Sequence, residues 1–360
     1  KQIYTNCLSQ ASYYLESNGE AVIIDPIRDS NLYLDLVKTR KVKVKYILET
    51  HFHADFISGH LDLKEILGAD IIFGSCAETD YEILKADHES VFELGLIKIK
   101  VLHTPGHTPE SVCFLVYNEK GDEYCVFTGD TLFIGEVGRP DLAINNLVSE
   151  FDLAGQLYES LNNILMRLND NVIIYPGHGP GSACGKHFSK DIISTIEDQK
   201  KNNYALQKMS KDLFVKNVLD GMLLPPAYFS HGAKMNKKGY KNTNELLENN
   251  VKKFLIKDLA KELSSGAIIL DVRLGDDFEK GFVKGSINIA KTTQSFATWV
   301  GAVIPVHLNL IIVCYPEEEL EVASRLARVG YEKILGFITN FSEINSEMIK
   351  KIDCVSPKNI

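Results

Sequence analysis

The stretch Thr50–Phe56, with the sequence Thr-His-Phe-His-Ala-Asp-Phe, decides how this chain is interpreted. It places His51 and His53 two positions apart, and the carboxylate of Asp55 follows two positions later. The stretch comes directly after an apolar, strand-like run at 44–49, so these side chains are expected in the loop that follows a buried strand. Imidazole and carboxylate groups gathered at the end of a strand are typical of a metal site.

Three further segments have the same design, a residue of metal-ligand type in a glycine-containing turn after an apolar run. They are Thr104–Thr108 (Thr-Pro-Gly-His-Thr), Thr128–Thr131 (Thr-Gly-Asp-Thr) and Tyr175–Gly179 (Tyr-Pro-Gly-His-Gly). In this order they contribute His107, Asp130 and His178. Strands alternating with helices, and ligands at strand ends, indicate an α/β protein in which sheets are covered by helices.

The order of the four motifs resembles the metallo-β-lactamase superfamily, whose first motif usually reads His-x-His-x-Asp-His. This resemblance implies an αββα sandwich with a metal site at one edge of two packed sheets. It also implies two ligand sets: His51, His53 and His107 for a first ion, and Asp55, a further histidine and His178 for a second, with Asp130 bridging the two. Phe56 stands where the further histidine is expected, so we expect one metal ion per chain.

Longer matches at 50–60, 104–111, 127–142 and 175–186 resemble persulfide dioxygenases fused to rhodanese-like domains. The resemblance implies that His51, His107 and Asp130 bind one Fe(II) ion per chain, a 2-His-1-carboxylate set. It implies that His53, Asp55 and His178 do not bind the metal ion themselves but have catalytic roles around it, orienting the metal ligands and water. The implied reaction uses O2 to oxidise the terminal sulfur of a small thiol persulfide to sulfite, with release of the thiol.

Three residues near the third and fourth motifs are predicted to bind the substrate. Arg139 has the planar cation that suits a carboxylate or phosphate, although an ion pair with Asp141 is an alternative. Lys186 is expected to help, and to favour a thiolate at Cys184 that would relay sulfur; a buried, inert thiol is the alternative. Glutathione, coenzyme A and other small thiols all remain open as the carrier.

Two other functions are considered. A zinc-dependent hydrolase of the glyoxalase II thioesterase type would use a zinc-bound hydroxide, but Phe56 disfavours the second ion that such enzymes usually need. A non-catalytic scaffold for sulfur carriers is disfavoured because His51, His107 and Asp130 are all present.

A second unit follows, in which two apolar strands at 267–273 and 308–314 flank helical segments, so a parallel sheet is expected. Its opening, Leu270–Arg273 and then Phe278–Asn288, resembles a rhodanese domain. An active rhodanese carries a Cys-x-x-Gly-x-Arg loop, whereas the stretch 313–319 reads Val-Cys-Tyr-Pro-Glu-Glu-Glu. Three glutamates and a proline would not cradle an anion, so this module is predicted to be inactive.

The predicted organisation is a catalytic domain at 1–222, a linker at 223–250, a rhodanese-like domain at 251–350 and a tail at 351–360. A single helical segment is expected from Ser189 to about Val218. If a further, active rhodanese domain exists in the natural protein, sulfite could pass on to thiosulfate there.

The composition sets further expectations. A net charge of -9 argues against nucleic acid as a partner, and no apolar run is long enough for a membrane helix. Seven scattered cysteines do not form a disulfide framework and favour the cytoplasm. The family resemblance implies a homodimer or homotetramer, with the persulfide and O2 as the small-molecule partners.

Overall fold

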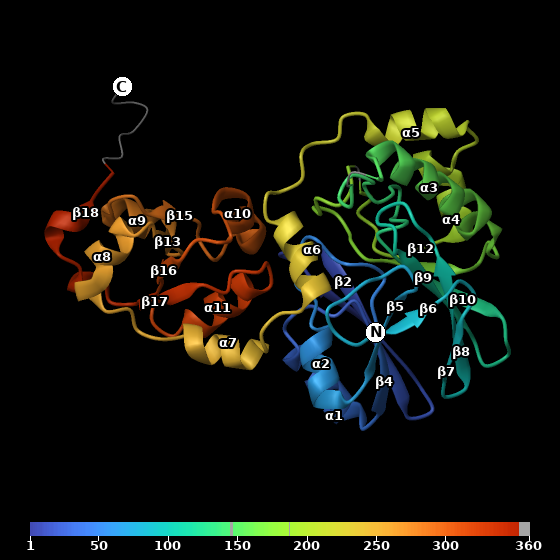
Figure 1. Ribbon diagram of the computed structural model, residues 1–360, viewed down its shortest axis with the longest axis horizontal. Coiled ribbons are helices and arrows are strands. Elements are labelled where there is room, and N and C mark those ends of the chain that lie inside the picture. Colours follow the sequence, from blue (N-terminus) through green and yellow to red (C-terminus); the bar gives the residue numbers. More distant parts are fainter. Residues whose placement is uncertain (145–146, 187, 353–360) are drawn as a thin grey trace. The chain divides into compact units, whose positions relative to one another are not determined.

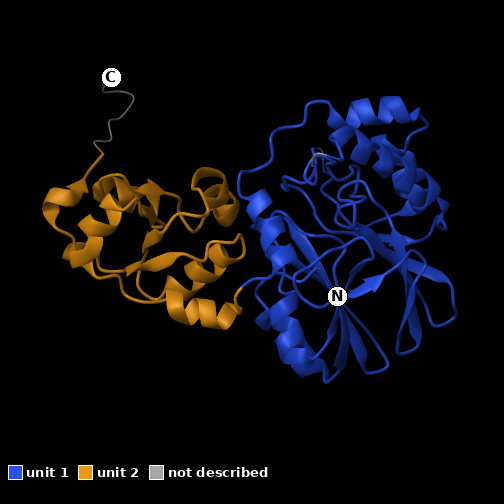
Figure 2. Ribbon diagram, in the orientation of Figure 1, with its two compact units in different colours: residues 1–240 blue, residues 241–360 orange. Residues whose placement is uncertain are grey.

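The computed structural model describes residues 1–144, 147–186 and 188–352. The chain divides into two compact units, Lys1–Tyr240 and Lys241–Ile360 (Figure 2). Most of the predicted tail, residues 353–360, lies outside the described residues. Among the helices that the structure describes, none is both long enough and apolar enough to cross a membrane.

The first sheet of unit 1 has six strands in the order β1-β2-β3-β4-β5-β6 (Figure 1). They are β1 (Gln2–Thr5), β2 (Gln10–Ser17), β3 (Glu20–Ile24), β4 (Lys43–Leu48), β5 (Asp70–Gly74) and β6 (Leu84–Ala86). Strands β3 and β4 run parallel, with Ile24 paired to Leu48. Parallel strands end at the same edge of a sheet. Asp25, directly after β3, therefore lies beside Glu49, which begins the loop that carries the histidine motif.

The second sheet also has six strands, in the order β12-β11-β10-β9-β8-β7. They are β7 (Val91–Leu94), β8 (Ile97–His103), β9 (Val112–Tyr117), β10 (Glu123–Gly129), β11 (Ile173–Pro176) and β12 (Ser194–Thr195). Strands β10 and β11 are parallel, and Gly129 is aligned with Pro176. This register brings the loops that carry Asp130 and His178 to one edge.

Two apolar layers hold unit 1 together. The layer between the sheets joins Val22 and Leu48 of the first sheet to Val101 and Phe114 of the second. The other layer packs the second sheet against α3, α4 and α5. The helices of unit 1 up to residue 219 are α1 (Asn31–Arg40), α2 (His60–Leu67), α3 (Glu150–Asn163), α4 (Ile196–Asn202) and α5 (Lys211–Leu219), with short 3-10 turns at Leu165–Arg167 and Tyr204–Leu206. Helices therefore cover both outer faces, and the predicted αββα sandwich is confirmed (Figure 1).

The single helical segment expected at 189–218 is wrong. The chain there forms β12, α4, a 3-10 turn and α5. Thr195 and Ser210 each cap a new helix with a side-chain oxygen, which satisfies the first free N–H groups. Between the helices, the buried Asn203 amide donates to the Glu136 carbonyl oxygen at 3.1 Å, so the chain is held away from a continuous helix.

The stretch expected as a linker, 223–250, contains two helices that the sequence analysis did not predict, α6 (Phe229–Lys238) and α7 (Thr243–Asn250). Helix α6 belongs to unit 1 and α7 to unit 2, with the division after Tyr240. The buried positions of α6 are Phe229, Gly232 and Asn236. Only one of these is a large apolar residue, so no apolar repeat of helical period appears in the sequence.

Unit 2 has a four-stranded sheet in the order β15-β13-β16-β17, and its neighbouring strands are all parallel. The strands are β13 (Ile268–Asp271), β15 (Ile287–Asn288), β16 (Leu310–Val313) and β17 (Ile334–Ile338), and β14 (Phe282–Val283) pairs separately with β18 (Ile349–Lys350). The helices besides α7 are α8 (Leu259–Ser264), α9 (Gly275–Lys280), α10 (Phe296–Val303) and α11 (Glu319–Ala327), with 3-10 turns at Ile256–Asp258, Phe341–Glu343 and Ser346–Met348. The predicted parallel sheet is confirmed.

The loop after β16 explains why unit 2 is expected to be inert. Cys314 is buried, and burial, together with the charges of Glu319 and Glu318, raises the pKa of its thiol to about 12. The Tyr315 N–H donates to the Glu318 carboxylate at 3.3 Å, so a backbone donor that could bind an anion is already occupied. A thiol in this state has almost no thiolate, the form that reacts with sulfur donors.

We therefore expect Cys314 to resist alkylation in the native protein at about pH 8, because the thiolate is the reacting form. Mass spectrometry after brief iodoacetamide treatment measures this. The exposed Cys76 is the internal control and should be labelled, and both cysteines should react after unfolding. Rapid labelling of native Cys314 would contradict the inert assignment.

Candidate metal centre

Four loops of unit 1 bring the predicted ligands together. His51 follows β4, His107 follows β8, Asp130 follows β10 and His178 follows β11. All four side chains are buried. The sheet registers described above place these strand ends at one edge of the sandwich, so residues far apart in the sequence meet there.

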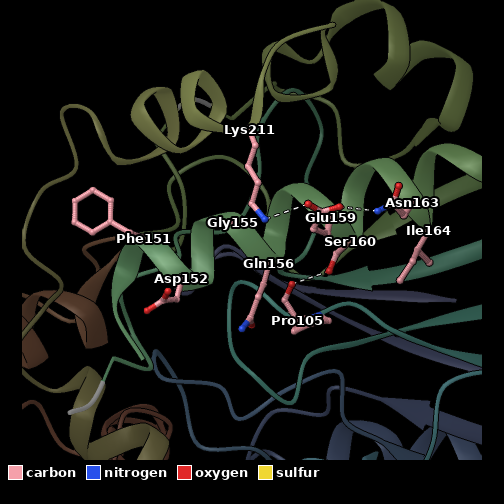
Figure 3. A pocket seen from close by; sticks show the side chains of 10 residues that line it. All are labelled: Pro105, Phe151, Asp152, Gly155, Gln156, Glu159, Ser160, Asn163, Ile164 and Lys211. Atoms are coloured by element: carbon pink, nitrogen blue, oxygen red, sulfur yellow. Dashed lines mark hydrogen bonds and ion pairs between the residues drawn. The ribbon is translucent and has the colours of Figure 1, made fainter. Parts of the chain in front are cut away.

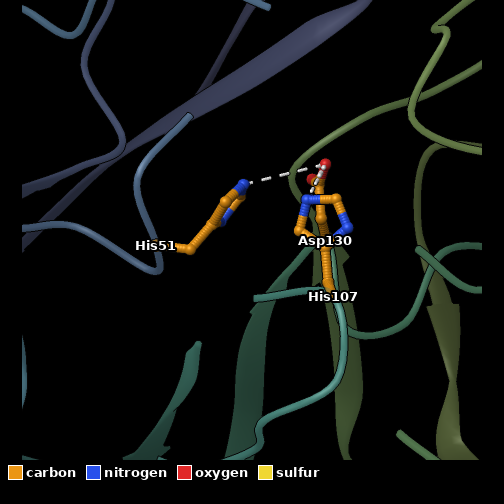
Figure 4. Close-up of side chains that lie close together, drawn as sticks. All are labelled: His51, His107 and Asp130. Atoms are coloured by element: carbon orange, nitrogen blue, oxygen red, sulfur yellow. Dashed lines mark ion pairs between the residues drawn. The ribbon is translucent and has the colours of Figure 1, made fainter. Parts of the chain in front are cut away.

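His51, His107 and Asp130 form a compact group whose ligand atoms lie within 4.8 Å of one another (Figure 4). Asp130 Oδ2 lies 3.9 Å from His51 Nε2 and 3.5 Å from His107 Nε2. Among the described residues this oxygen accepts no hydrogen bond, although it is buried. An unpaired carboxylate oxygen facing two imidazoles is what a bound cation would satisfy, so the residues fit the predicted metal ion.

Hydrogen bonds fix the proton on each of the two imidazoles. The Thr50 hydroxyl lies 2.9 Å from the Asp25 carboxylate and 2.9 Å from His51 Nδ1. Since a carboxylate only accepts, the hydroxyl donates to Asp25 and accepts from His51 Nδ1–H. His107 Nδ1–H donates to the Arg139 carbonyl oxygen at 2.8 Å. Each imidazole therefore turns a free Nε2 lone pair towards Asp130, as a metal ligand must.

The charge states agree with this arrangement. Burial lowers the pKa of His51 well below 6.5 and also lowers the pKa of His107, so both are neutral. Burial alone would raise the pKa of Asp130, but the charge and hydrogen bond of His178, with His51 and His107, overcome that effect and lower it. Two neutral imidazoles and one carboxylate form the predicted ligand set.

His178 joins two carboxylates. Its Nδ1 lies 2.7 Å from Asp130 Oδ1 and its Nε2 lies 2.8 Å from Asp55 Oδ2. Burial opposes a charge on the ring, but Asp130 and then Asp55 raise the pKa of His178 well above 6.5. Asp55 thus holds His178, and His178 holds the Asp130 oxygen that does not face His51 and His107. The catalytic roles of His178 and Asp55 stay predictions.

His53 does not join the group of His51, His107 and Asp130. Its Nε2 lies 3.2 Å from Asp25 Oδ1 and 3.5 Å from Glu49 Oε2, with which it forms a buried group, while its ring packs on that of His51 with centroids 4.2 Å apart. These contacts have ion-pair distances without the alignment of hydrogen bonds. The sequence analysis did not assign Asp25 or Glu49 to the site; their one signal is that each directly follows a buried strand that ends at this edge.

Phe56 is fully buried and packs on the His53 ring, with centroids 4.3 Å apart. It therefore forms an apolar wall beside His53. Asp55, His178 and Cys184 form another group with ligand atoms within 4.8 Å of one another. Because both nitrogens of His178 are held by carboxylates, an ion there would have to displace these hydrogen bonds.

The two cations predicted to bind substrate, Arg139 and Lys186, are hydrogen-bonded by the protein itself, and their substrate role stays a prediction. The Arg139 guanidinium makes two bonds of 2.7 Å to Asp141, and it also donates to the carbonyl oxygens of Ala183 and Leu223. The ion pair left open by the sequence is therefore the one that forms. Lys186 Nζ donates to the carbonyl oxygens of Asn217 and Asp220, at 2.8 and 2.9 Å.

The surroundings of Cys184 disfavour the thiolate expected there. Cys184 is buried, and burial, followed by the charges of Asp55 and Asp130, raises the pKa of its thiol well above 9. The Lys186 ammonium, which was expected to lower this pKa, is turned towards backbone carbonyls. Cys184 does lie beside the metal centre, in the group with Asp55 and His178, as a neutral thiol.

A cavity of about 600 Å³ opens over the metal centre. Its lining includes His107 and Phe52 on one side and Pro226 and Lys234 on the other. A second cavity, of about 550 Å³, runs along α3 between Pro105 and Lys211 (Figure 3). His107 lines the first cavity, whereas no metal-centre residue lines the second.

Helix α6 packs directly on the loop that carries the first motif. Asn236 Nδ2 donates to the carbonyl oxygens of His53 and Phe56, at 2.7 and 2.8 Å, and Asn236 Oδ1 accepts from Ser58 N–H at 2.9 Å. A Cβ atom at Gly232 would lie 2.3 Å from the Ala54 carbonyl oxygen, so only glycine permits this approach. The helix that the sequence analysis took for a linker is therefore part of the site.

The fold and the site define a metal-binding αββα protein with an appended α/β domain. The chain belongs to the metallo-β-lactamase superfamily: the model of that superfamily matches residues 5–74 and 79–178, and the rhodanese-like domain model matches residues 255–344. A crystal structure titled metallo-beta-lactamase from Staphylococcus aureus is 29% identical, with a TM-score of 0.81, and the match covers 94% of this chain and 97% of that one.

Similar proteins carry two kinds of name. A probable hydroxyacylglutathione hydrolase of Schizosaccharomyces pombe is 31% identical over 51% of this chain and 69% of its own length. The mitochondrial persulfide dioxygenase ETHE1 of Mus musculus is also 31% identical, over 57% of this chain and 73% of its own length. Identity alone therefore does not separate a hydrolase from a dioxygenase.

Replacing Asn236 with alanine should weaken metal binding about 10- to 100-fold, because the loop next to His51 loses three hydrogen bonds. Competition with a chelator measures the metal affinity, and circular dichroism checks the fold. Asn163→Ala removes an exposed side chain that pairs with Glu159 and is the matched control. Equal metal affinities in the two variants would show that α6 does not hold the loop.

Proposed function

We propose that this protein is a non-haem Fe(II) persulfide dioxygenase with one iron ion per chain. The observation that carries the proposal is the ligand set, in which His51, His107 and Asp130 meet while Phe56 fills the place of a further ligand. Two histidines and one carboxylate with open positions are typical of Fe(II) oxygenases. The named activity of the mouse relative supports the same class.

The proposed reaction converts a persulfide, O2 and water into a thiol, sulfite and two protons. A bound Fe(II) ion would supply the redox chemistry and the open coordination positions. The residues supply orientation: His178 and Asp55 hold Asp130, and Thr50 and Asp25 hold His51.

Asp55 gives the site a carboxylate oxygen that can accept a hydrogen bond. Its Oδ1 is buried and accepts no hydrogen bond within the part of the chain that the structure describes, while its Oδ2 binds His178. Asp55 Oδ1 is therefore a free acceptor beside His178, able to take a hydrogen bond from a water molecule that reaches the metal centre.

A zinc-dependent thioesterase is the second candidate. It is favoured by the similarity to the hydrolase of Schizosaccharomyces pombe and by the group of Asp55, His178 and Cys184, which could hold a second ion. Such an enzyme would use a zinc-bound hydroxide to attack a thioester. The same metal analysis distinguishes the two candidates.

Protein purified without oxygen should contain about one iron ion per chain, as expected for a single three-ligand site. Adding a thiol persulfide should cause oxygen uptake and sulfite formation in equal amounts. His107→Ala should lose both the iron and the oxygen uptake, because one of the three ligands is removed. Two zinc ions per chain, with thioester hydrolysis and no oxygen uptake, would identify a hydrolase instead.

Phe56→His should restore the further ligand of the superfamily motif. We expect this variant, loaded with zinc, to bind about two ions per chain where the parent protein binds about one. Phe56→Leu keeps the site apolar and is the control. The stoichiometry is measured by elemental analysis after removal of loosely bound metal, and equal zinc content in all three proteins would show that Phe56 does not set the metal count.

A further inference from the structure

Helix α6 presents one face to the cavity over the metal centre. Its residues that line the cavity include Ser230, Ala233, Lys234, Lys237 and Lys238. This spacing of three and four residues places them on one side of a helix. The opposite side is packed on the metal-binding loop through Gly232 and Asn236, so the lysine-bearing face has a fixed position relative to the metal centre.

The acidic groups of the cavity have partners. Glu110 accepts a hydrogen bond from the Phe52 N–H at 3.0 Å, and Asp141 is bound by Arg139. Glu78 lies 3.9 Å from Lys237 Nζ and partly balances its charge. The negative charge near this cavity is therefore largely committed to protein groups.

The ammonium groups of Lys234 and Lys238 differ from these charges, since neither makes a side-chain hydrogen bond or ion pair within the described ranges 1–144, 147–186 and 188–352. They are four residues apart, which on a helix places their Cβ atoms about 6 Å from each other. Two ammonium groups at this spacing can approach one carboxylate or phosphate group.

We propose that Lys234 and Lys238 bind the anionic group of the thiol carrier, so that the substrate is a persulfide of an anionic thiol. This inference rests on the proposed function and replaces Arg139 and Lys186, which are held by other protein groups. The cavity of about 600 Å³ is in the range that accommodates a ligand of peptide or cofactor size. A carboxylate, as in glutathione, and a phosphate, as in coenzyme A, share the required charge.

The test compares wild-type protein with the double variant Lys234→Gln/Lys238→Gln. Oxygen uptake is measured with glutathione persulfide, coenzyme A persulfide and the neutral persulfide of 2-mercaptoethanol. The ratio of the KM for an anionic persulfide to the KM for the neutral one should rise about 3- to 10-fold in the variant, as expected for two partly exposed charge contacts. A rise with only one of the anionic carriers supports the proposal and identifies the carboxylate or the phosphate as the group that is bound.

The matched control is Lys208→Gln/Lys216→Gln, which removes the same charge from two exposed lysines that do not line this cavity. Its KM ratio should equal that of the wild-type protein. An unchanged ratio in the Lys234/Lys238 variant, or an equal change in the control, would overturn the proposal.

A binding measurement separates this proposal from the proposed function. Calorimetry with the thiols glutathione and coenzyme A, on the metal-loaded protein, needs no turnover. If no persulfide causes oxygen uptake, the dioxygenase proposal fails, whereas weaker thiol binding by the Lys234→Gln/Lys238→Gln variant than by the control still supports the two lysines. Equal thiol binding by both variants would contradict the proposed role of Lys234 and Lys238.

Discussion

The Asp130 carboxylate is an ionised group buried between two sheets, and the site is built around its need for partners. One oxygen is bound by His178, and the other faces His51 and His107 without a hydrogen bond. A buried carboxylate oxygen without a hydrogen bond is destabilising, so a cation at this oxygen would stabilise the fold as well as supply chemistry. The bonds that hold each imidazole, from Thr50 and the Arg139 carbonyl, turn both Nε2 atoms towards the same point.

The ligands could be predicted from the sequence because each lies in a short turn after an apolar strand. The partners of long side chains could not, because they depend on tertiary placement. Arg139 is bound not only by the nearby Asp141 but also by the carbonyls of residues 183 and 223, and Lys186 by those of residues 217 and 220. Every residue has a backbone carbonyl oxygen, so the sequence does not show which of them will accept a hydrogen bond from a distant side chain. The two cations were therefore assigned to the substrate.

Helix α6 was missed for a related reason. Helices are recognised in sequence by an apolar stripe, but α6 meets the metal-binding loop through a glycine and an asparagine. Gly232 permits close approach to the Ala54 carbonyl, and Asn236 satisfies the carbonyls of His53 and Phe56. A helix that packs on polar backbone needs small and hydrogen-bonding residues, and such a face resembles a linker in composition.

Phe56 bears on how many metal ions the site can hold. As an apolar residue it offers no ligand to a second ion, and as an aromatic ring it packs on His53, whose Nε2 faces Asp25 and Glu49. Relatives at equal identity carry hydrolase and dioxygenase names, so the ligand set, and not overall similarity, must carry the choice between them. Three ligands with open positions favour Fe(II) and O2 over a pair of zinc ions.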